Sequence, residues 1–545
     1  MSSSASALSV SRPAFGPPVA LGLALSLGIY LLGAGYFGSV QAIWVDESTQ
    51  MSGQALPLDT QLAWMLRQAD VSMGVPLDRM PPLSYWAGTG WSWVFGLSET
   101  SMRWFGIIMV LACAPAIFMT GRMAGGLAGG LFATAFIFAS PSMMVHAVEI
   151  RTYPLFFCLS TWAVWSYVCL TTPKTERATT WHLWALLVLF LSGASYAHFY
   201  GLPLAACLLF SLFVHHLWIR RSLWPVVLAT LAFAGAWSGV LPFVLSSLGD
   251  GTRGGEAAAP AFDATNLIYG LGRLGFRHLF HPVLLASPVA LALGLLGVLG
   301  LTVLTVLWRA PAPAARDPAA ERFVPIAFVA MPLGLGFLGL SALQVLLFVT
   351  NRGEIDALVP HYNLWQLPLV ICFLACALRP RAVRALALAC AGVTIAAKVL
   401  GAVLLLQNPV LYTHGAGEWL ADAIEDPART LVIHVADGAW GSLFFPVNYL
   451  TQQQTTQWLR QQDGQVGQLA PGVMLPIADP ATAQLAFDRV IEIQARNFTS
   501  RDLSHLVTGA RECSFPTTLS EIPGTTRETY CSYVSAVRRI TDNAP

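Results

Sequence analysis

The chain has 545 residues, of which 55% are hydrophobic and only 11% carry a charge. Soluble globular proteins carry about 25% charged residues, so this composition excludes an ordinary soluble protein and indicates a polytopic membrane protein. The net charge of +1 gives no reason to expect a nucleic acid or another strongly charged macromolecule as a partner.

About eleven apolar stretches are long enough for membrane-spanning helices, since a bilayer core needs roughly 20 apolar residues per helix. Residues 1–19 precede them, are rich in Ser, Ala and Pro, and are predicted to be disordered. We predict a polytopic α-helical membrane domain over residues 20–409. Its spans are predicted to begin near Ala20, Trp104, Gly126, Tyr153, Trp181, Gly201, Leu223, Pro282, Phe323, Leu364 and Ala382.

Basic residues occur in alternate loops, and this asymmetry predicts the orientation in the membrane. One set of loops carries Arg12, Arg122, Lys174, Arg177, Arg220, Arg221, Arg309, Arg316, Arg322, Arg379, Arg381 and Arg384. That side is predicted to be cytoplasmic and to hold the N-terminus. The outer side then holds the turns that carry Asp46, Arg151 and His198. An odd number of spans places the C-terminal region on the outer side as well.

Residues 410–545 differ in composition from the apolar region and are predicted to form a small α/β domain. Residues 418–424 read as an amphipathic helix, and residues 430–435 and 488–493 read as strands. Cys513 and Cys531 are candidates for a disulfide if this domain lies outside the cytoplasm.

The first outer loop, residues 41–103, is too long for a simple connection between two spans. It opens with Asp46 and Glu47 at the membrane edge, where carboxylates are costly to bring nearer to lipid. Further along, the loop contains the segments Met80-Pro81-Pro82-Leu83-Ser84-Tyr85 and Phe95-Gly96-Leu97-Ser98-Glu99, followed by Arg103.

Three later outer turns extend this pattern. They contain Glu149-Ile150-Arg151-Thr152-Tyr153-Pro154-Leu155, then Tyr196-Ala197-His198-Phe199-Tyr200-Gly201, then His361-Tyr362 with Pro368. In order and sidedness, these motifs resemble the GT-C glycosyltransferases. The resemblance is greatest to the bacterial branch related to protein O-mannosyltransferases and the lipid A aminoarabinose transferase, and it covers residues 21–405. Met80 and His361 depart from the His and Arg that the family has there, and the second departure argues against phosphate binding at His361.

The resemblance implies an inverting glycosyltransferase that moves a sugar from a polyprenyl-phosphate donor to a hydroxyl acceptor on a protein, lipid or polysaccharide. It implies action at the periplasmic face of a bacterial inner membrane, with a periplasmic C-terminal domain. Asp46 occupies the family position of the general base, which removes the acceptor proton. The leaving phosphate needs a preorganised cation. Arg151 is the first candidate because guanidinium binds phosphate oxygens bidentately, and a snorkelling Lys398 is the second.

The other predicted substrate-binding residues lie in the same outer turns and are Glu47, Glu149, Tyr153, His198, His361 and Tyr362. Glu47 is open to two further interpretations, as a contact to acceptor or sugar and as a ligand that shares a divalent metal with another acid. No other cofactor is predicted. The lipid-linked sugar donor is a co-substrate, and the surrounding partners are membrane lipids.

Each candidate also has a structural interpretation. Asp46 and Glu47 can cap the helix that follows them, since acids favour helix N-termini, and Arg151 can pair with another loop to hold the fold. Two other functions stay open, a transporter or flippase of lipid-linked sugars and a non-catalytic scaffold with an outer binding domain. A transporter should place ionisable residues near the middle of the membrane, whereas these charges gather in the outer turns.

Overall fold

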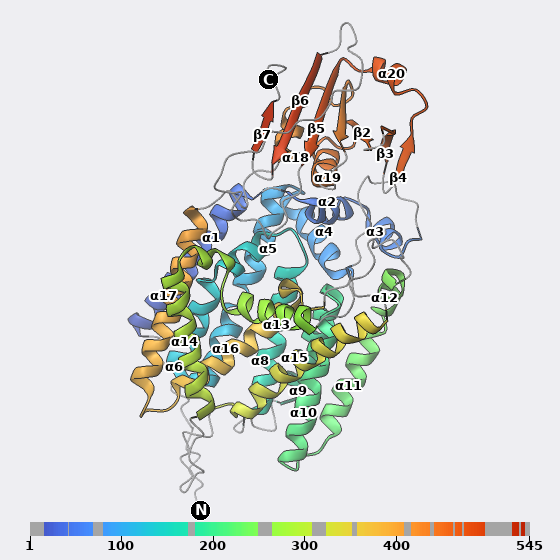
Figure 1. The fold of residues 1–545 in the computed structure, drawn as a ribbon. Helices are drawn as coiled ribbons and strands as arrows, with labels where there is room; N and C mark the ends of the chain where they lie inside the picture. Colours follow the sequence, from blue (N-terminus) through green and yellow to red (C-terminus); the bar gives the residue numbers. More distant parts are fainter. Residues whose placement is uncertain are drawn as a thin grey trace, which may run out of the picture.

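The computed structural model describes residues 16–41, 43–68, 80–172, 180–248, 264–307, 323–350, 357–407, 416–435, 441–461, 464–470, 473–495, 526–533 and 536–539. A long helical region is followed by a C-terminal β-sheet, which lies beyond one end of the helices (Figure 1). We call this end of the helical region the sheet end.

Within the described ranges, eight helices are long and apolar enough to cross a membrane, so the chain is a multi-pass membrane protein. They are α1 (Pro17–Val40), α5 with α6 (Glu99–Phe138), α8 (Tyr153–Thr171), α10 (Gly201–Trp218), α14 (Pro288–Leu307), α15 (Ile326–Val349), η4 to η5 (Pro360–Leu378) and α17 (Arg384–Gln407). The segment η4 to η5 consists of η4 (Pro360–Gln366), α16 (Leu367–Ala375) and η5 (Cys376–Leu378).

The predicted number of eleven spans is not established. A helix does lie at each of the eleven predicted places. However, α9 (Thr180–Ala197) is short, and α11 (Trp224–Trp237) meets α12 (Leu241–Leu248) at a bend of 51°. Counting that bent pair as one span gives nine. The first helix begins at Pro17, slightly before the predicted start.

The helical segment α5 (Glu99–Leu111) and α6 (Ala114–Phe138) contains a sharp reversal at two glycines. Gly125 and Gly126 have non-helical backbone angles, with φ of 70° and ψ of −159° at Gly126. A Cβ atom added to Gly121 would lie 2.5 Å from the carbonyl oxygen of Gly129. Eight residues of straight helix would separate these two positions by about 12 Å. The two halves of α6 therefore fold back on each other, near the predicted span start at Gly126.

We expect Gly126→Ala to destabilise the protein by about 1–3 kcal/mol, because this backbone region is essentially restricted to glycine. The nearest atom to an added Cβ is 3.9 Å away, so the cost comes from the backbone and not from a clash. The measurement is the Tm of the purified protein in detergent. Gly235→Ala in α11, whose added Cβ meets nothing within 4 Å, is the matched control and should be neutral or stabilising. Equal Tm values for Gly126→Ala and the wild type would contradict this account.

Short helices at the sheet end occupy the loops between the long ones. The first loop contains α2 (Val45–Gln54), α3 (Leu58–Met65) and α4 (Leu83–Phe95). Later loops contain α7 (Pro141–Val148), α13 (Ala264–Leu279) and η2 (Pro282–Ala286). The polar residues of the candidate site lie on or beside these short helices.

The C-terminal region forms a seven-stranded sheet in the order β4-β3-β2-β1-β5-β6-β7. Its strands are β1 (Thr430–Val435), β2 (Thr456–Arg460), β3 (Val466–Ala470), β4 (Val473–Pro476), β5 (Arg489–Ala495), β6 (Thr526–Tyr533) and β7 (Ala536–Arg539). Strand β1 pairs in parallel with β2 and β5, β5 pairs in parallel with β6, and the pairs at both edges are antiparallel.

The helices α18 (Ala416–Asp422) and α19 (Gly441–Leu450) pack against one face of this sheet through an apolar cluster that includes Leu420, Val447 and Ile491. A short turn of helix, α20 (Pro480–Ala483) with η7 (Gln484–Ala486), precedes β5. The predicted helix at residues 418–424 and the two predicted strands are confirmed. Cys531 lies in β6, but Cys513 lies outside the described residues, so the disulfide stays a prediction.

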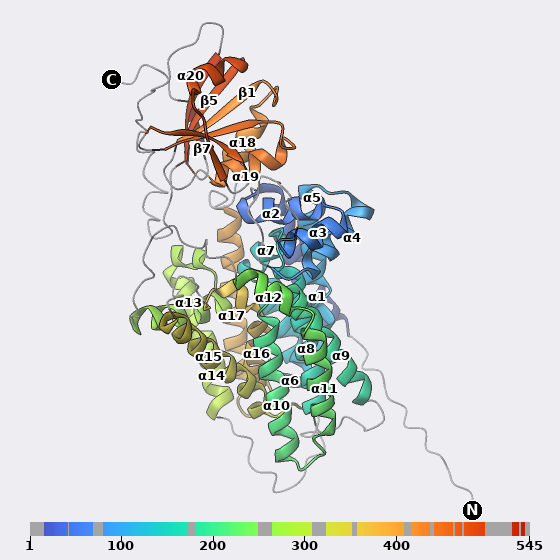
Figure 2. The same ribbon diagram turned by 90° about the vertical axis from the view of Figure 1, so that its right-hand side faces the viewer.

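The sheet and the helical region meet through α19, which packs on α2. Figure 2 shows α18 and α19 between the sheet and the short helices of the first loop. The C-terminal region therefore lies directly above the segment that carries Asp46.

Candidate active site

Asp46 lies in the first turn of α2 and keeps 40% of its side chain exposed. Arg151, in the turn between α7 and α8, is 4% exposed and points its guanidinium at Asp46. One nitrogen, Nη2, lies 3.4 Å from Asp46 Oδ2, and Nη1 donates to the Asp46 carbonyl oxygen at 3.1 Å. The buried guanidinium of Arg151 thus contacts both the side chain and the backbone of Asp46. The structure brings these two predicted site residues together.

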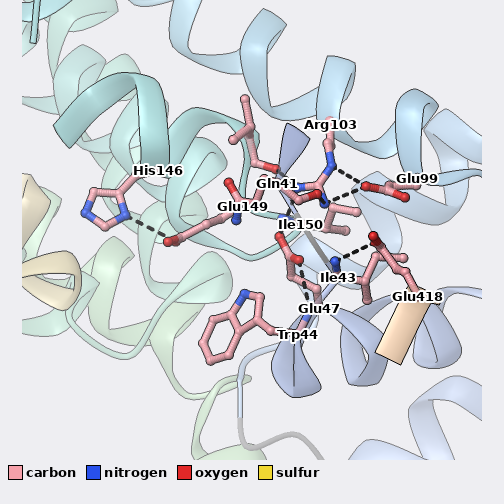
Figure 3. A network of polar contacts seen from close by, with 11 residues as sticks. Gln41, Ile43, Trp44, Glu47, Glu99, Arg103, His146, Glu149, Ile150 and Glu418 are labelled. Atoms are coloured by element: carbon pink, nitrogen blue, oxygen red, sulfur yellow. Dashed lines mark hydrogen bonds and ion pairs between the residues drawn. The ribbon is translucent and has the colours of Figure 1, made fainter. Parts of the chain in front are cut away.

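Glu47 points the other way, into the protein, and is fully buried. Its Oε1 accepts hydrogen bonds from the backbone N–H of Ile150 at 2.8 Å and from Arg103 Nη1 at 3.3 Å, and its Oε2 accepts from the N–H of Trp44 at 3.3 Å. Figure 3 shows Glu47 at the centre of these contacts. Both carboxylate oxygens are engaged, so the geometry favours a role in holding the loop over the predicted contact with substrate.

Arg103 on α5 connects this network to two more segments. Its Nη2 donates to Glu99 Oε1 at 2.7 Å and to the carbonyl oxygen of Gln41 at 2.8 Å. Its Nη1 donates to the carbonyl oxygen of Val148 at 2.9 Å. The end of α1, the start of α2, α5 and the end of α7 therefore meet at one buried ion pair between Arg103 and Glu47.

Burial raises the pKa of Glu47 to about 7, although Arg103 and the N–H of Ile150 favour its charged form. An unfolded chain restores the ordinary value of 4.5. Between these two values the folded state binds more protons than the unfolded state. The stabilising contribution of this group is therefore complete below about pH 4.5 and is lost as the pH rises through about 7.

We expect the Tm of the wild type, relative to that of Glu47→Gln, to fall as the pH rises from 4.5 to 7. The stabilisation that Glu47 loses between these two pH values is on the order of 3 kcal/mol. The glutamine variant keeps its stability over this range because glutamine cannot titrate. Melting curves from tryptophan fluorescence in detergent at a series of pH values measure this difference. Parallel curves of Tm against pH for the two proteins would contradict the raised pKa.

Four other sequence candidates form a compact ring cluster beside this loop. Tyr153 begins α8, His198 lies between α9 and α10, and His361 and Tyr362 lie in η4. The centroid distance is 4.9 Å between Tyr153 and His361, 5.2 Å between His198 and Tyr362, and 4.6 Å between His361 and Tyr362. Turns far apart in the sequence thus place their aromatic and imidazole rings together.

His198 is held as a neutral imidazole. Burial and then the positive charge of Arg151 lower its pKa to about 3. Its Nδ1 accepts the backbone N–H of Tyr200 at 3.1 Å, so the neutral ring carries its proton on Nε2. Within the described part of the chain, buried Nε2 has no hydrogen-bond partner. The ring cluster therefore contains a hydrogen-bond donor, the Nε2–H of His198, that could serve a ligand.

Glu149 does not reach Asp46 and instead accepts from His146, with 3.1 Å between Oε2 and Nδ1. The His146 ring lies 5.9 Å from that of His361, so His146 adjoins the cluster although it is not among the predicted site residues. Tyr200, whose ring lies 5.7 Å from that of Tyr362, was also missed. Its place in the motif with His198 was the available signal.

Lys398 on α17 points inward and not toward the membrane surface, and is 1% exposed. Its Nζ lies 3.3 Å from Ser140 Oγ and 3.9 Å from the centre of the Phe136 ring. Its charge also contributes, after burial, to lowering the pKa values of His278 to about 4 and His281 to about 3. Lys398 therefore lies in a buried part of the helical region near His278 and His281, both of which stay neutral at pH 7.

Among the residues that the structure describes, no group of three or more His, Cys, Asp and Glu side chains is placed to hold a metal ion. Glu47, the acid for which a shared metal was considered, has its oxygens bonded to Arg103 and to backbone N–H groups. These residues do not fit a divalent metal.

An apolar groove of about 520 Å³ runs between α10 and α15. Its walls include Leu202, Pro203, Phe210, Gly339, Leu340 and Leu343. The lining begins at Leu202 in the first turn of α10, two residues after Tyr200 in the sequence. From Leu202 to Phe210 the helix rises about 12 Å, which carries the groove well into the span.

Comparison with solved structures confirms the GT-C fold. One similar structure is the crystal structure of ArnT from Cupriavidus metallidurans bound to undecaprenyl phosphate. The match covers 82% of this chain and 86% of the ArnT chain, with a TM-score of 0.50 and 14% sequence identity. The match to the apo state of ArnT covers 81% of this chain and 85% of the ArnT chain, with a TM-score of 0.51 and 14% sequence identity. The Archaeoglobus fulgidus oligosaccharyltransferase in complex with Zn and sulfate covers 81% and 62%, with a TM-score of 0.44 and 11% identity. No family model and no curated protein matches the sequence.

Proposed function

We propose that the protein is an inverting glycosyltransferase that moves a sugar from a polyprenyl-phosphate donor to a hydroxyl acceptor, with Asp46 as the general base. The observation that carries this proposal is the contact between exposed Asp46 and buried Arg151. It brings together a carboxylate that could accept a proton and a guanidinium that could bind a phosphate. ArnT, which shares the fold, was crystallised with undecaprenyl phosphate, and this supports a lipid-linked donor.

In this reaction the acceptor oxygen forms a bond to the anomeric carbon as the bond from that carbon to the phosphate oxygen breaks. The acceptor proton passes to the Asp46 carboxylate, and the leaving polyprenyl phosphate takes the electron pair. A single displacement of this kind inverts the anomeric carbon. One acid suffices because phosphate leaves without being protonated, provided that a preorganised cation stabilises its charge.

Arg151 is the proposed partner of that phosphate. Guanidinium binds phosphate oxygens bidentately, and Nη2 now contacts the carboxylate of Asp46. A phosphate that replaces this carboxylate on Arg151 would release Asp46 to accept a proton. Donor binding would in this way prepare the base. Lys398 remains a candidate for a lipid phosphate only if the donor reaches the interior, because its ammonium group lies beside Ser140.

The groove between α10 and α15 is the proposed path of the polyprenyl chain. Its lining is apolar, and it begins in the first turn of α10, which follows the turn that carries His198. A lipid chain in the groove would bring its phosphate and sugar to the ring cluster. The Nε2–H of His198 could then donate to a sugar or phosphate oxygen, and the tyrosine rings could pack on the sugar. Glu149 would act through His146, which it contacts.

The proposed reaction takes place on the periplasmic face of a bacterial inner membrane. We assign residues 20–409 to the transmembrane catalytic domain and residues 410–545 to a periplasmic domain. The Lys and Arg residues of the predicted inner loops support this orientation. A lipid-linked donor fits that side, and the acceptor is a hydroxyl group on a glycan, lipid or protein.

Asp46→Asn should reduce sugar transfer by about 10²–10⁴-fold, because the amide cannot accept the acceptor proton. The measurement is product formation from a labelled polyprenyl-phosphate sugar in membranes, normalised to folded protein by size-exclusion chromatography. Asp59→Asn is the matched control. This exposed acid of α3 bonds only its neighbour Thr60 among the contacts of the described residues, and its change should leave transfer intact.

Full activity of Asp46→Asn would disprove the assignment of the base. The same membranes, reconstituted as proteoliposomes, separate the alternative functions. A flippase would move the labelled donor across the bilayer without forming a glycosylated product, and a scaffold would do neither.

Gly339→Phe should raise the KM for long-chain donors by about tenfold or more, because the ring would fill part of the groove and remove roughly 1.5–3 kcal/mol of apolar contact. The KM for a donor with a shorter prenyl chain should rise less. Gly334→Phe is the matched control on the same helix, since both glycines have open space around an added Cβ and only Gly339 lines the groove. Equal effects of the two changes on KM would argue against the groove as the lipid path.

A further inference from the structure

Glu418, on α18 of the C-terminal region, reaches into the helical region. Its Oε1 accepts the backbone N–H of Ile43 at 2.9 Å, a contact between residues 375 positions apart in the sequence. Both partners are buried, with 7% of Glu418 and 3% of Ile43 exposed. Figure 3 shows Glu418 entering the network beside Glu47 from the C-terminal side.

The bonded N–H belongs to the short connection that leads from α1 into α2. In this connection the carbonyl of Gln41 accepts from Arg103, the N–H of Ile43 donates to Glu418, and the N–H of Trp44 donates to Glu47. Arg103 and Glu47 belong to the helical region. Glu418 is therefore the contribution of the C-terminal region to a connection that ends two residues before Asp46.

Apolar contacts hold α19 against the same loop. Tyr449 packs on the buried cluster that contains Ile43 and Met51, and Phe445 packs on the cluster that contains Trp64 and Tyr85. Helix α19 is thus anchored on two apolar clusters of the helical region, and α18 packs on α19. This packing lets a single side chain of α18 keep a fixed place next to the backbone of Ile43.

We propose that Glu418 is a positioning residue through which the C-terminal domain fixes the start of α2, and with it the carboxylate of Asp46. The inference rests on the proposed role of Asp46 as base. Arg151 holds Asp46 from the α7–α8 turn, while Glu418 holds the segment just before it. The orientation of the base then depends on a contact from the C-terminal domain.

Three variants of the full-length protein test this proposal. Glu418→Ala removes the acceptor and leaves a buried N–H without its partner. Glu418→Gln keeps a carbonyl oxygen at the same place and is the conservative rescue. Glu528→Ala removes a carboxylate that bonds Arg489 at 2.7 Å inside the sheet and controls for general damage to the domain.

The first measurement is the transfer kinetics with a labelled polyprenyl-phosphate sugar. We expect Glu418→Ala to lower kcat by about 10–100-fold with little change in KM, because a misplaced base slows the chemical step without weakening donor binding. Glu418→Gln and Glu528→Ala should retain kcat. An unchanged kcat in Glu418→Ala, an equal loss in Glu418→Gln, or an equal loss in Glu528→Ala would each overturn the proposal.

The second measurement is amide hydrogen exchange over residues 41–48 in the same proteins. Exchange should accelerate in Glu418→Ala and stay slow in Glu418→Gln. Hydrogen exchange does not depend on the reaction, so it tests the positioning role of Glu418 separately from the proposed role of Asp46 as base. If Asp46→Asn kept full activity, the base would be wrong, yet exchange would still show whether Glu418 holds this segment. Unchanged exchange in Glu418→Ala would overturn the positioning role whatever the activity.

Discussion

The buried contact between Arg103 and Glu47 is the interaction on which the candidate site depends. Neither group has access to water, so each must find hydrogen-bond partners inside the protein. Those partners come from the connection after α1, the start of α2, α5 and the turn after α7. Removing one member of such a pair typically costs 3–5 kcal/mol, since the other charge stays buried. The network therefore fixes the relative positions of four segments at the sheet end.

This anchor also orients Asp46. Consecutive residues of a helix do not share a face, so a Glu47 that points inward directs Asp46 outward, toward solvent and Arg151. The Tyr153 turn is attached to the same frame through Ile150, whose N–H bonds Glu47. Thr152 next to it donates to the carbonyl of Ala197 at 2.5 Å and brings the His198 turn alongside. One ion pair thus sets the place of the exposed acid, and the turns that follow assemble the ring cluster around it.

Much of this arrangement could be predicted from the sequence. The basic residues of the loops predicted that Asp46, Arg151 and His198 lie on the same side of the membrane. The structure brings Arg151 next to Asp46, and His198 next to Tyr153. The sequence could not distinguish Asp46 from Glu47 by role, because Glu47 finds its partner Arg103 on a different helix. Nor could it foresee that Glu418 contacts Ile43, since no local periodicity reports a contact across 375 positions. The sequence likewise could not foresee that Lys398 is buried beside Ser140, because a lysine in a span can extend toward the membrane surface or toward a neighbouring helix.

The two adjacent acids differ in how far solvent and ligands can reach them. Arg151 is 4% exposed, but the Asp46 side chain that it contacts is 40% exposed, so an incoming phosphate can reach this pair and replace the carboxylate while Arg151 keeps an anionic partner. The buried pair of Arg103 with Glu47 cannot exchange partners in this way, because no water or ligand reaches it. A proposed base must lose its resting partner during each turnover, whereas the backbone that carries it must stay in place. Two neighbouring carboxylates, one solvent-facing and one buried, satisfy both requirements within a single helical turn. The contact from Glu418 extends this fixed frame to the C-terminal region and leaves Asp46 itself free to exchange.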